Sequence, residues 1–118
     1  MTTENIKVKI LPHGVKPDIK NDVVVIKSPI TISINPGEQI TINSGLCVDI
    51  PRGYFGSLFP IHNNVIITGI IEHKNNKEIK INIVNSSKYI INFYQNDNVC
   101  ELIIFQTRIP QIEIVNDF

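Results

Sequence analysis

The 118-residue sequence contains no tryptophan and no alanine, and it has only four leucines and one methionine. Alanine and leucine are the strongest helix formers, so their scarcity disfavours a helical protein. Cysteine is also rare: Cys47 and Cys100 each stand in an apolar run, where a small buried thiol is expected. Two cysteines are too few for a secreted scaffold held together by disulfides. We therefore expect an intracellular protein, located in the cytoplasm or the nucleus.

Neither sign of charge is in excess, because eleven basic residues balance eleven acidic ones. The basic residues form no patch or stripe, so nucleic acid is not an expected partner. No apolar run approaches the roughly 18 residues that span a bilayer. The first ten residues also lack the long apolar core of a signal peptide. Membranes are therefore not expected partners either.

The chain is rich in β-branched residues, with twenty-five isoleucines and ten valines. These residues fit a pleated sheet better than a helix. Isoleucines alternate with polar residues in four segments, at 30–34, 40–43, 79–83 and 112–114. This alternation predicts strands with one buried face. Unbroken apolar runs at 23–26, 65–67 and 102–105 predict strands buried on both faces.

Clusters of proline, glycine and asparagine separate these segments at short intervals, as in an antiparallel barrel or sandwich. The length fits one domain over residues 1–118. We assign an N-terminal strand and turn to 1–20, and the core with a C-terminal strand to 21–118. The predicted fold class is all-β, with little or no helix.

Several chemistries are excluded by the residue inventory. The sequence has no GxxxxGK[ST] phosphate loop and no GxGxxG after a strand. His13, His62 and His73 share no metal-ligand spacing with each other or with the cysteines, so no metal site is predicted. Solvated loop histidines and core thiols are the expected roles.

The segment Pro36–Phe59, PGEQITINSGLCVDIPRGYFGSLF, carries a resemblance to a known family. It gives a strand after Pro36-Gly37, a Ser44-Gly45 pair, a second strand, and a Pro-x-Gly-Tyr-x-Gly corner at 51–56. The strand at 98–104 and the segment at 110–113 follow in the family's order. Residues 22–117 thus resemble the trimeric dUTPase-like (β-clip) superfamily. The resemblance implies a dUTPase-like distorted antiparallel barrel or sandwich, assembled as a homotrimer with swapped C-terminal strands.

The catalytic motifs of that family are degraded in this sequence. Where the family has Arg-Ser-Gly after a proline, this chain has Pro60 followed by Ile61 and His62. Glu72 stands where the family's water-activating aspartate is found. The family's stacking tyrosine aligns with Asn75, and a closing glycine aligns with Lys77. The family's glycine-rich C-terminal arm is expected to be missing.

The resemblance therefore implies a degenerate family member, and it assigns no catalytic residue firmly. Glu72 is a vestigial catalytic candidate, with a plain solvated acid as its simpler interpretation. Gly69, Ile70 and His62 are weak candidates for nucleotide binding. We expect a non-catalytic, homotrimeric structural or protein-interaction module without a cofactor, whose protein partner is unknown.

Other interpretations remain open at this stage. The telokin-like proteins of baculoviruses are similar β-clip proteins without enzymatic motifs, which points to a viral source and an infected host cell. The alternative function is a residual deoxyuridine nucleotide-binding protein or a weak dUTP pyrophosphatase. Mg²⁺ is its cofactor and Glu72 its base. A third interpretation is an unrelated isoleucine-rich barrel whose similarity is coincidental.

Overall fold

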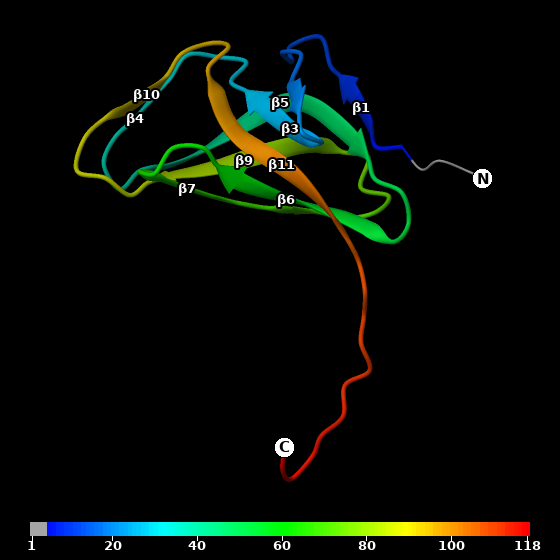
Figure 1. Cartoon of the computed structure of the whole chain (residues 1–118). Coiled ribbons are helices and arrows are strands. Elements are labelled where there is room, and N and C mark those ends of the chain that lie inside the picture. Colours follow the sequence, from blue (N-terminus) through cyan, green and yellow to red (C-terminus); the bar gives the residue numbers. More distant parts are fainter. Residues whose placement is uncertain (1–4) are drawn as a thin grey trace.

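A computed structural model describes residues 5–118 and shows strands and turns without a helix in that range (Figure 1). The strands are β1 (Lys7–Ile10), β2 (Asp18–Lys20), β3 (Val23–Lys27), β4 (Ile32–Ile34), β5 (Gln39–Asp49), β6 (Tyr54–Pro60), β7 (Val65–Thr68), β8 (Ile70–Ile71), β9 (Glu78–Asn85), β10 (Ile91–Phe93) and β11 (Asn98–Gln106). The predicted all-β class is confirmed. Among these residues there is no helix of the length and apolarity that a membrane crossing requires.

The strands form two larger sheets and one small ribbon. The order of the first sheet is β1-β5-β9-β7, and that of the second is β2-β3-β11-β6-β8. β10 and β4 form a separate two-stranded ribbon, which extends to one side of the molecule in Figure 1. Every strand pair is antiparallel. The inward faces of the two larger sheets supply a common hydrophobic core.

Isoleucine alternation builds the core as predicted in the central strand β9. Ile79, Ile81 and Ile83 are buried, while Lys80 and Asn82 between them are exposed. The thiol of Cys100 is fully buried, and burial raises its pKa to about 12. Cys100 therefore stays a neutral core thiol at physiological pH, as expected. The same expectation is wrong for Cys47, which is only partly buried.

The unbroken apolar runs do not all behave as predicted. The run at 23–26 is buried at Val24, Val25 and Ile26. Two-sided burial is wrong for β7, where Ile66 is 51% exposed, and for the end of β11, where Phe105 is 39% exposed. β7 and β11 each have one face toward the core and one toward solvent, so alternate side chains face outward.

In a single copy of the chain, the predicted C-terminal strand at 112–114 does not form. The segment after β11 has no strand and leaves the body of the molecule (Figure 1). Ile112 and Ile114 are 87% and 97% exposed. A strand needs a partner for its backbone groups, and residues 112–114 have none among the described residues.

The connection after β1 is fixed by a close contact between two glycines. The amide of Leu11 donates to the carbonyl of Gly45 at 2.8 Å. A Cβ on Gly45 would lie 2.2 Å from the Cα of Gly14, and Gly45 has a φ of +74°. Gly45 lies in the irregular stretch of β5 between Asn43 and Cys47. The contact joins the N-terminal segment to the first sheet.

A buried asparagine fixes the connection between β9 and the β4–β10 ribbon. The Asn85 side chain is fully buried. Its amide nitrogen donates to the carbonyls of Ile34 and Tyr89 at 2.9 and 2.7 Å. Its oxygen accepts from the backbone and hydroxyl of Ser87 at 2.9 and 2.7 Å. All four contacts hold the turn after β9 in one conformation.

Candidate functional site

The best-defined candidate site is a slot between β8 and β9. The chain runs from β7, which pairs with β9, into β8, which pairs with β6 in the other sheet. Gly69 makes this transition, and its carbonyl accepts a hydrogen bond from the amide of Leu58 at 2.9 Å. β8 and β9 therefore separate and leave a space of about 140 Å³ between them. We call this space the β8–β9 slot.

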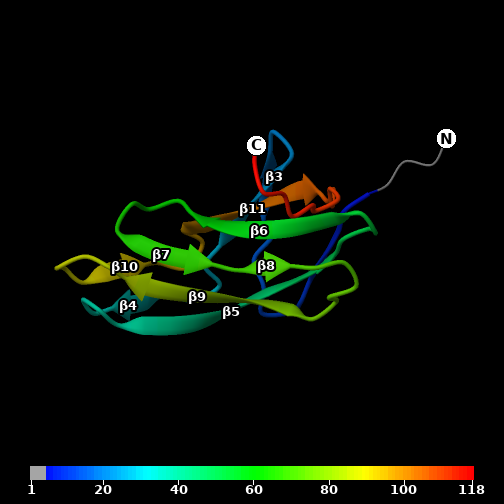
Figure 2. The ribbon, with the colours of Figure 1, turned by 90° about the horizontal axis from the view of Figure 1, so that it is seen from below.

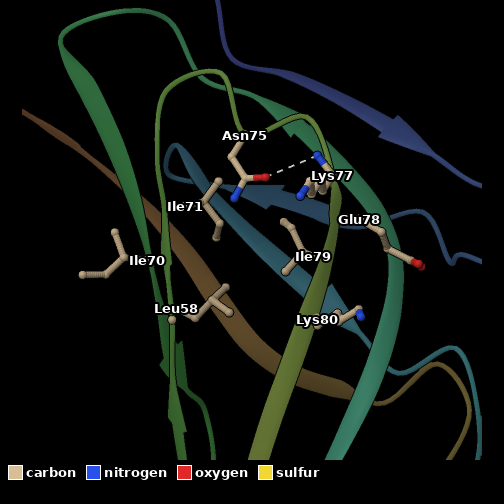
Figure 3. A pocket seen from close by; sticks show the side chains of 9 residues that line it. Leu58, Ile70, Ile71, Asn75, Lys77, Glu78, Ile79 and Lys80 are labelled. Atoms are coloured by element: carbon tan, nitrogen blue, oxygen red, sulfur yellow. Dashed lines mark hydrogen bonds between the residues drawn. The ribbon is translucent and has the colours of Figure 1, made fainter.

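The slot has an apolar floor and polar edges (Figure 3). The buried side chains of Leu58, Ile71 and Ile79 line it. β8 pairs only with β6, and residues 78–81 of β9 pair only with β5. The backbone groups that border the slot are thus open to a ligand. An apolar cavity of about 150 Å³ can hold a benzene ring, so the slot has room for one six-membered ring.

The turn between β8 and β9, residues 72–77, forms a tip that closes one end of the slot. The side-chain oxygen of Asn75 accepts from the amide of Lys77 at 3.4 Å, as Figure 3 shows. Lys74 turns the chain with a φ of +65°. The Nδ1–H of His73 donates to the carbonyl of Ile50 at 2.8 Å, which anchors the tip to the end of β5. His73 is therefore half-buried and bound, so its predicted role as a solvated loop histidine is wrong.

Glu72 does not line the slot. It is exposed and lines a separate hollow of about 360 Å³ together with Tyr54, His73 and Thr107. Ile70 and Glu72 alternate with the buried Ile71, so they project from the outer face of the second sheet. Glu72 is thus outside the lining of the slot, although Ile70 borders both the slot and the hollow.

The other candidates are also divided. Gly69 and Ile70 line the slot. His62 is exposed in the turn after β6, and its ring meets that of Phe93 edge-on at 5.1 Å. Ser57 pairs with Ile70, so His62 lies beyond the far end of β6 from the slot. Within residues 5–118, no three His, Cys, Asp or Glu side chains gather as metal ligands.

A hydrogen-bonded pair that the sequence did not indicate lies beside the slot. Glu78 lines the slot, and its Oε2 is 2.5 Å from Nε2 of His13 in the β1–β2 connection. The same oxygen accepts from the amide of Gly45 at 2.8 Å. The hydrogen bond from His13 lowers the pKa of Glu78, burial opposes this shift, and the Gly45 amide adds to it. The pair joins the slot to the N-terminal segment.

This pair predicts an acid sensitivity that depends on Glu78. A carboxyl whose pKa is lower in the folded state stabilises the fold above its unfolded pKa and loses that contribution as pH falls through the folded value. We expect the melting temperature of the natural protein to fall more steeply below pH 4.5 than that of Glu78→Gln. Glu113→Gln, in the exposed tail, is the control and should follow the natural protein. If the melting temperatures of Glu78→Gln and the natural protein fall in parallel as the pH is lowered, the Glu78 carboxylate does not stabilise the fold as described.

Sequence reasoning missed Lys80 and Glu78 as residues that line the slot. Their period-two spacing places both on the exposed side of β9, and this orientation can be predicted from the sequence. The divergence of β8 from β9 cannot be predicted from the sequence, because it depends on β8 pairing with β6 and not with β9, its neighbour in sequence.

Comparison with known proteins places this arrangement in a family. The family model described as dUTPase matches residues 22–118. The deoxyuridine 5'-triphosphate nucleotidohydrolase of Escherichia phage T5 is 29% identical over 79 residues, covering 61% of this chain and 53% of that protein. The chain thus spans about half the length of that relative.

Solved structures share the fold at lower sequence identity. The dUTPase of Staphylococcus bacteriophage 80alpha matches with a TM-score of 0.83 and 20% identity, over 98% of this chain and 99% of the other. That dUTPase is described as controlling transfer of virulence genes by a proto-oncogenic G protein-like mechanism. A mutant dUTPase from phage phi11 of S. aureus matches with a TM-score of 0.81, 20% identity, and 98% and 99% coverage. With its family model matched over residues 22–118, this chain belongs to the dUTPase family.

Proposed function

We propose that this protein is a non-catalytic member of the dUTPase family that acts as a homotrimeric structural or protein-interaction module. The observation that carries the proposal is that Glu72 does not line the β8–β9 slot, and that no arginine lines the slot or the hollow beside Glu72. Arg52 lies in the turn before β6 and Arg108 in the tail after β11. Within one copy, a triphosphate held at the slot has no guanidinium from the described residues around it.

The expected loss of rate is large. Removing one preorganised donor of a charged transition state costs about 10²–10³ in rate. Ile61 stands at the position of the family's arginine and cannot donate a hydrogen bond through its side chain. Displacing a reacting group by about 1 Å can cost about a hundredfold more. These losses support a protein without useful dUTP hydrolysis.

A role other than hydrolysis has a precedent among the structural relatives. The phage 80alpha dUTPase is described as controlling the transfer of virulence genes. Proteins with this fold can therefore act on a process beyond nucleotide hydrolysis. This supports an interaction role for a chain whose catalytic motifs are degraded, and a viral source is part of the same proposal.

A second candidate is residual binding of a deoxyuridine nucleotide, and the slot itself favours it. The slot fits one ring, and the backbone groups of β8 and β9 face it without a strand partner. Lys77 and Lys80 line it and supply positive charge for a phosphate. For this second candidate, Mg²⁺ binds only together with the triphosphate. Glu72 would then be the base of a weak hydrolysis.

A thermal-shift panel separates the two candidates. The full chain is heated with dUTP, dUMP or deoxyuridine, each with and without Mg²⁺. Binding to the folded state raises the melting temperature as ligand exceeds its Kd. No shift supports the interaction module, and a shift that Lys80→Glu abolishes supports residual binding. Lys88→Glu, in the exposed turn after β9, is the matched control, because it changes the net charge by the same two units as Lys80→Glu.

The homotrimer is part of the proposal, and two exposed apolar surfaces support it. On the outer face of the second sheet, the Phe105 ring stacks on that of Phe55 at 5.4 Å and meets that of Phe59 at 6.3 Å. The tail beyond β11 exposes Ile112 and Ile114. A single copy leaves these surfaces in water, whereas neighbouring copies can cover them.

Light scattering tests the assembly. We expect the natural protein to have a mass of about 40 kDa, three times 13.3 kDa, at micromolar concentration. Phe105→Asp places a charge in the aromatic surface and should give a monomer. Thr68→Asp, on the exposed face of β7, should keep the larger mass. A natural protein that runs as a monomer would contradict the trimer.

A further inference from the structure

β5 has an open edge over its first half. On one side, β9 pairs with residues 39–43; on the other side, β1 pairs only with residues 46–49. No other described strand borders β5. Figure 2 shows β5 along the lower margin of the ribbon, with β9 on its inner side. The open stretch is long enough for an added strand of about 16 Å.

A cavity of about 560 Å³ lies against this open edge. Its lining residues are Thr41, Ile42 and Asn43 of β5, Pro12–Val15 of the β1–β2 connection, and Pro29, Ile30 and Gln95. We call this cavity the β5 groove. Its volume falls within the range of about 300–1,000 Å³ that is typical of ligand sites. It lies outside the β8–β9 slot, with which it shares no lining residue.

The walls of the β5 groove are held in place by backbone hydrogen bonds. On one side, Leu11 is bonded to Gly45. On the other, the amide of Ser28 donates to the carbonyl of Asp97 at 2.8 Å. The amide of Gln95 donates to the hydroxyl of Thr31 at 2.9 Å. Walls that are already ordered reduce the entropy lost when a ligand binds.

The near absence of ionisable residues in the groove favours an uncharged ligand. His13 is the sole ionisable residue in its lining, and it is already paired with Glu78. The edge strands β1 and β2 carry lysines, the usual protection against unwanted strand addition, whereas residues 39–43 carry none. A charged segment would lose water in the groove without gaining a counter-charge.

We propose that the β5 groove binds an extended, uncharged peptide segment of a partner protein, which adds to the first sheet as a strand beside residues 39–43. The backbone of the segment bonds to the open edge of β5, and its alternate apolar side chains contact the half-exposed Ile30 and Val15. This is the mode in which main-chain bonds give affinity and alternate side chains give specificity. Binding at this groove does not depend on whether the slot hydrolyses a nucleotide.

The test uses the full chain and a labelled peptide of six alternating valines and threonines, blocked at both ends. We expect saturable binding by fluorescence anisotropy, together with slowed amide exchange of residues 41–43. A peptide N-methylated at every residue loses all its main-chain donors and should bind at least tenfold more weakly. Asn43→Lys adds the missing edge charge and should weaken binding of the unmethylated peptide by a similar factor. Thr68→Lys, on the exposed face of β7, should bind as the natural protein does.

Three results would overturn the proposal. One is no saturable binding, and another is equal affinity for the methylated and unmethylated peptides. The third is amide exchange of residues 41–43 that is already slow in the free protein and becomes fast on dilution to the monomer. In that case a second copy of this chain, and not a partner peptide, occupies the groove.

Discussion

Gly45→Ala is expected to remove most of the stability of the fold. The new methyl group would lie 2.2 Å from the Cα and 2.6 Å from the amide nitrogen of Gly14, so the two backbones must separate. That movement weakens the bonds from Leu11 to Gly45 and from Gly45 to Glu78. The positive φ adds about 1–2 kcal/mol of strain for a residue with a Cβ. We expect a loss of about 4 kcal/mol or more, against a typical domain stability of about 5–15 kcal/mol.

Gly37→Ala is the matched control for this substitution. Gly37 has a similar φ of +76°, but a Cβ there would meet nothing within 4 Å. It should therefore lose only the conformational strain of about 1–2 kcal/mol. Urea unfolding of both variants, at equal chain concentration because assembly shifts apparent stability, measures the difference. Equal losses at the two positions would show that the contact between the glycines is not tight.

Asn85→Ala is expected to cost about 3–5 kcal/mol, because a buried group with several partners is removed. The carbonyls of Ile34 and Tyr89 would lose their donor, and the amide of Ser87 would lose its acceptor. The site is fully buried, so water cannot replace these bonds without rearrangement. The β4–β10 ribbon should lose its fixed position as well.

Asn43→Ala is the control for Asn85→Ala, because Asn43 is an exposed asparagine on β5 of the same sheet. A surface substitution of this kind usually changes stability by no more than about 0.5 kcal/mol. Chemical denaturation gives both values. Amide exchange should also become faster in residues 86–93 of Asn85→Ala alone. A small loss at Asn85, similar to that at Asn43, would contradict the role of its hydrogen bonds.

The strands were largely predictable because isoleucine periodicity reports which side chains face the core. β9 is the clearest example, with Ile79, Ile81 and Ile83 inward and Lys80 outward. The alternation at 112–114 is equally regular, but this segment forms no strand in a single copy of the chain. Alternation shows that a segment can be a strand, but pairing requires a neighbour, which the single chain does not supply there.

The candidate site was less predictable because it depends on pairing between distant segments. The resemblance placed Glu72, Gly69 and Ile70 close together in sequence, and only Gly69 and Ile70 line the slot. The outward position of Glu72 follows from the burial of Ile71 and from the pairing of β8 with β6. The hydrogen bond between His13 and Glu78 spans 65 positions and has no local sequence signal.

Pyrophosphate release from dUTP with Mg²⁺ tests the central claim most directly. The purified full chain should give a rate indistinguishable from that of a reaction without protein, and Glu72→Ala should not change it. Glu72 does not line the slot, and no arginine lines the slot or the hollow beside Glu72. Release well above the protein-free control, and abolished by Glu72→Ala, would show that the chain is a working dUTPase and would contradict the account.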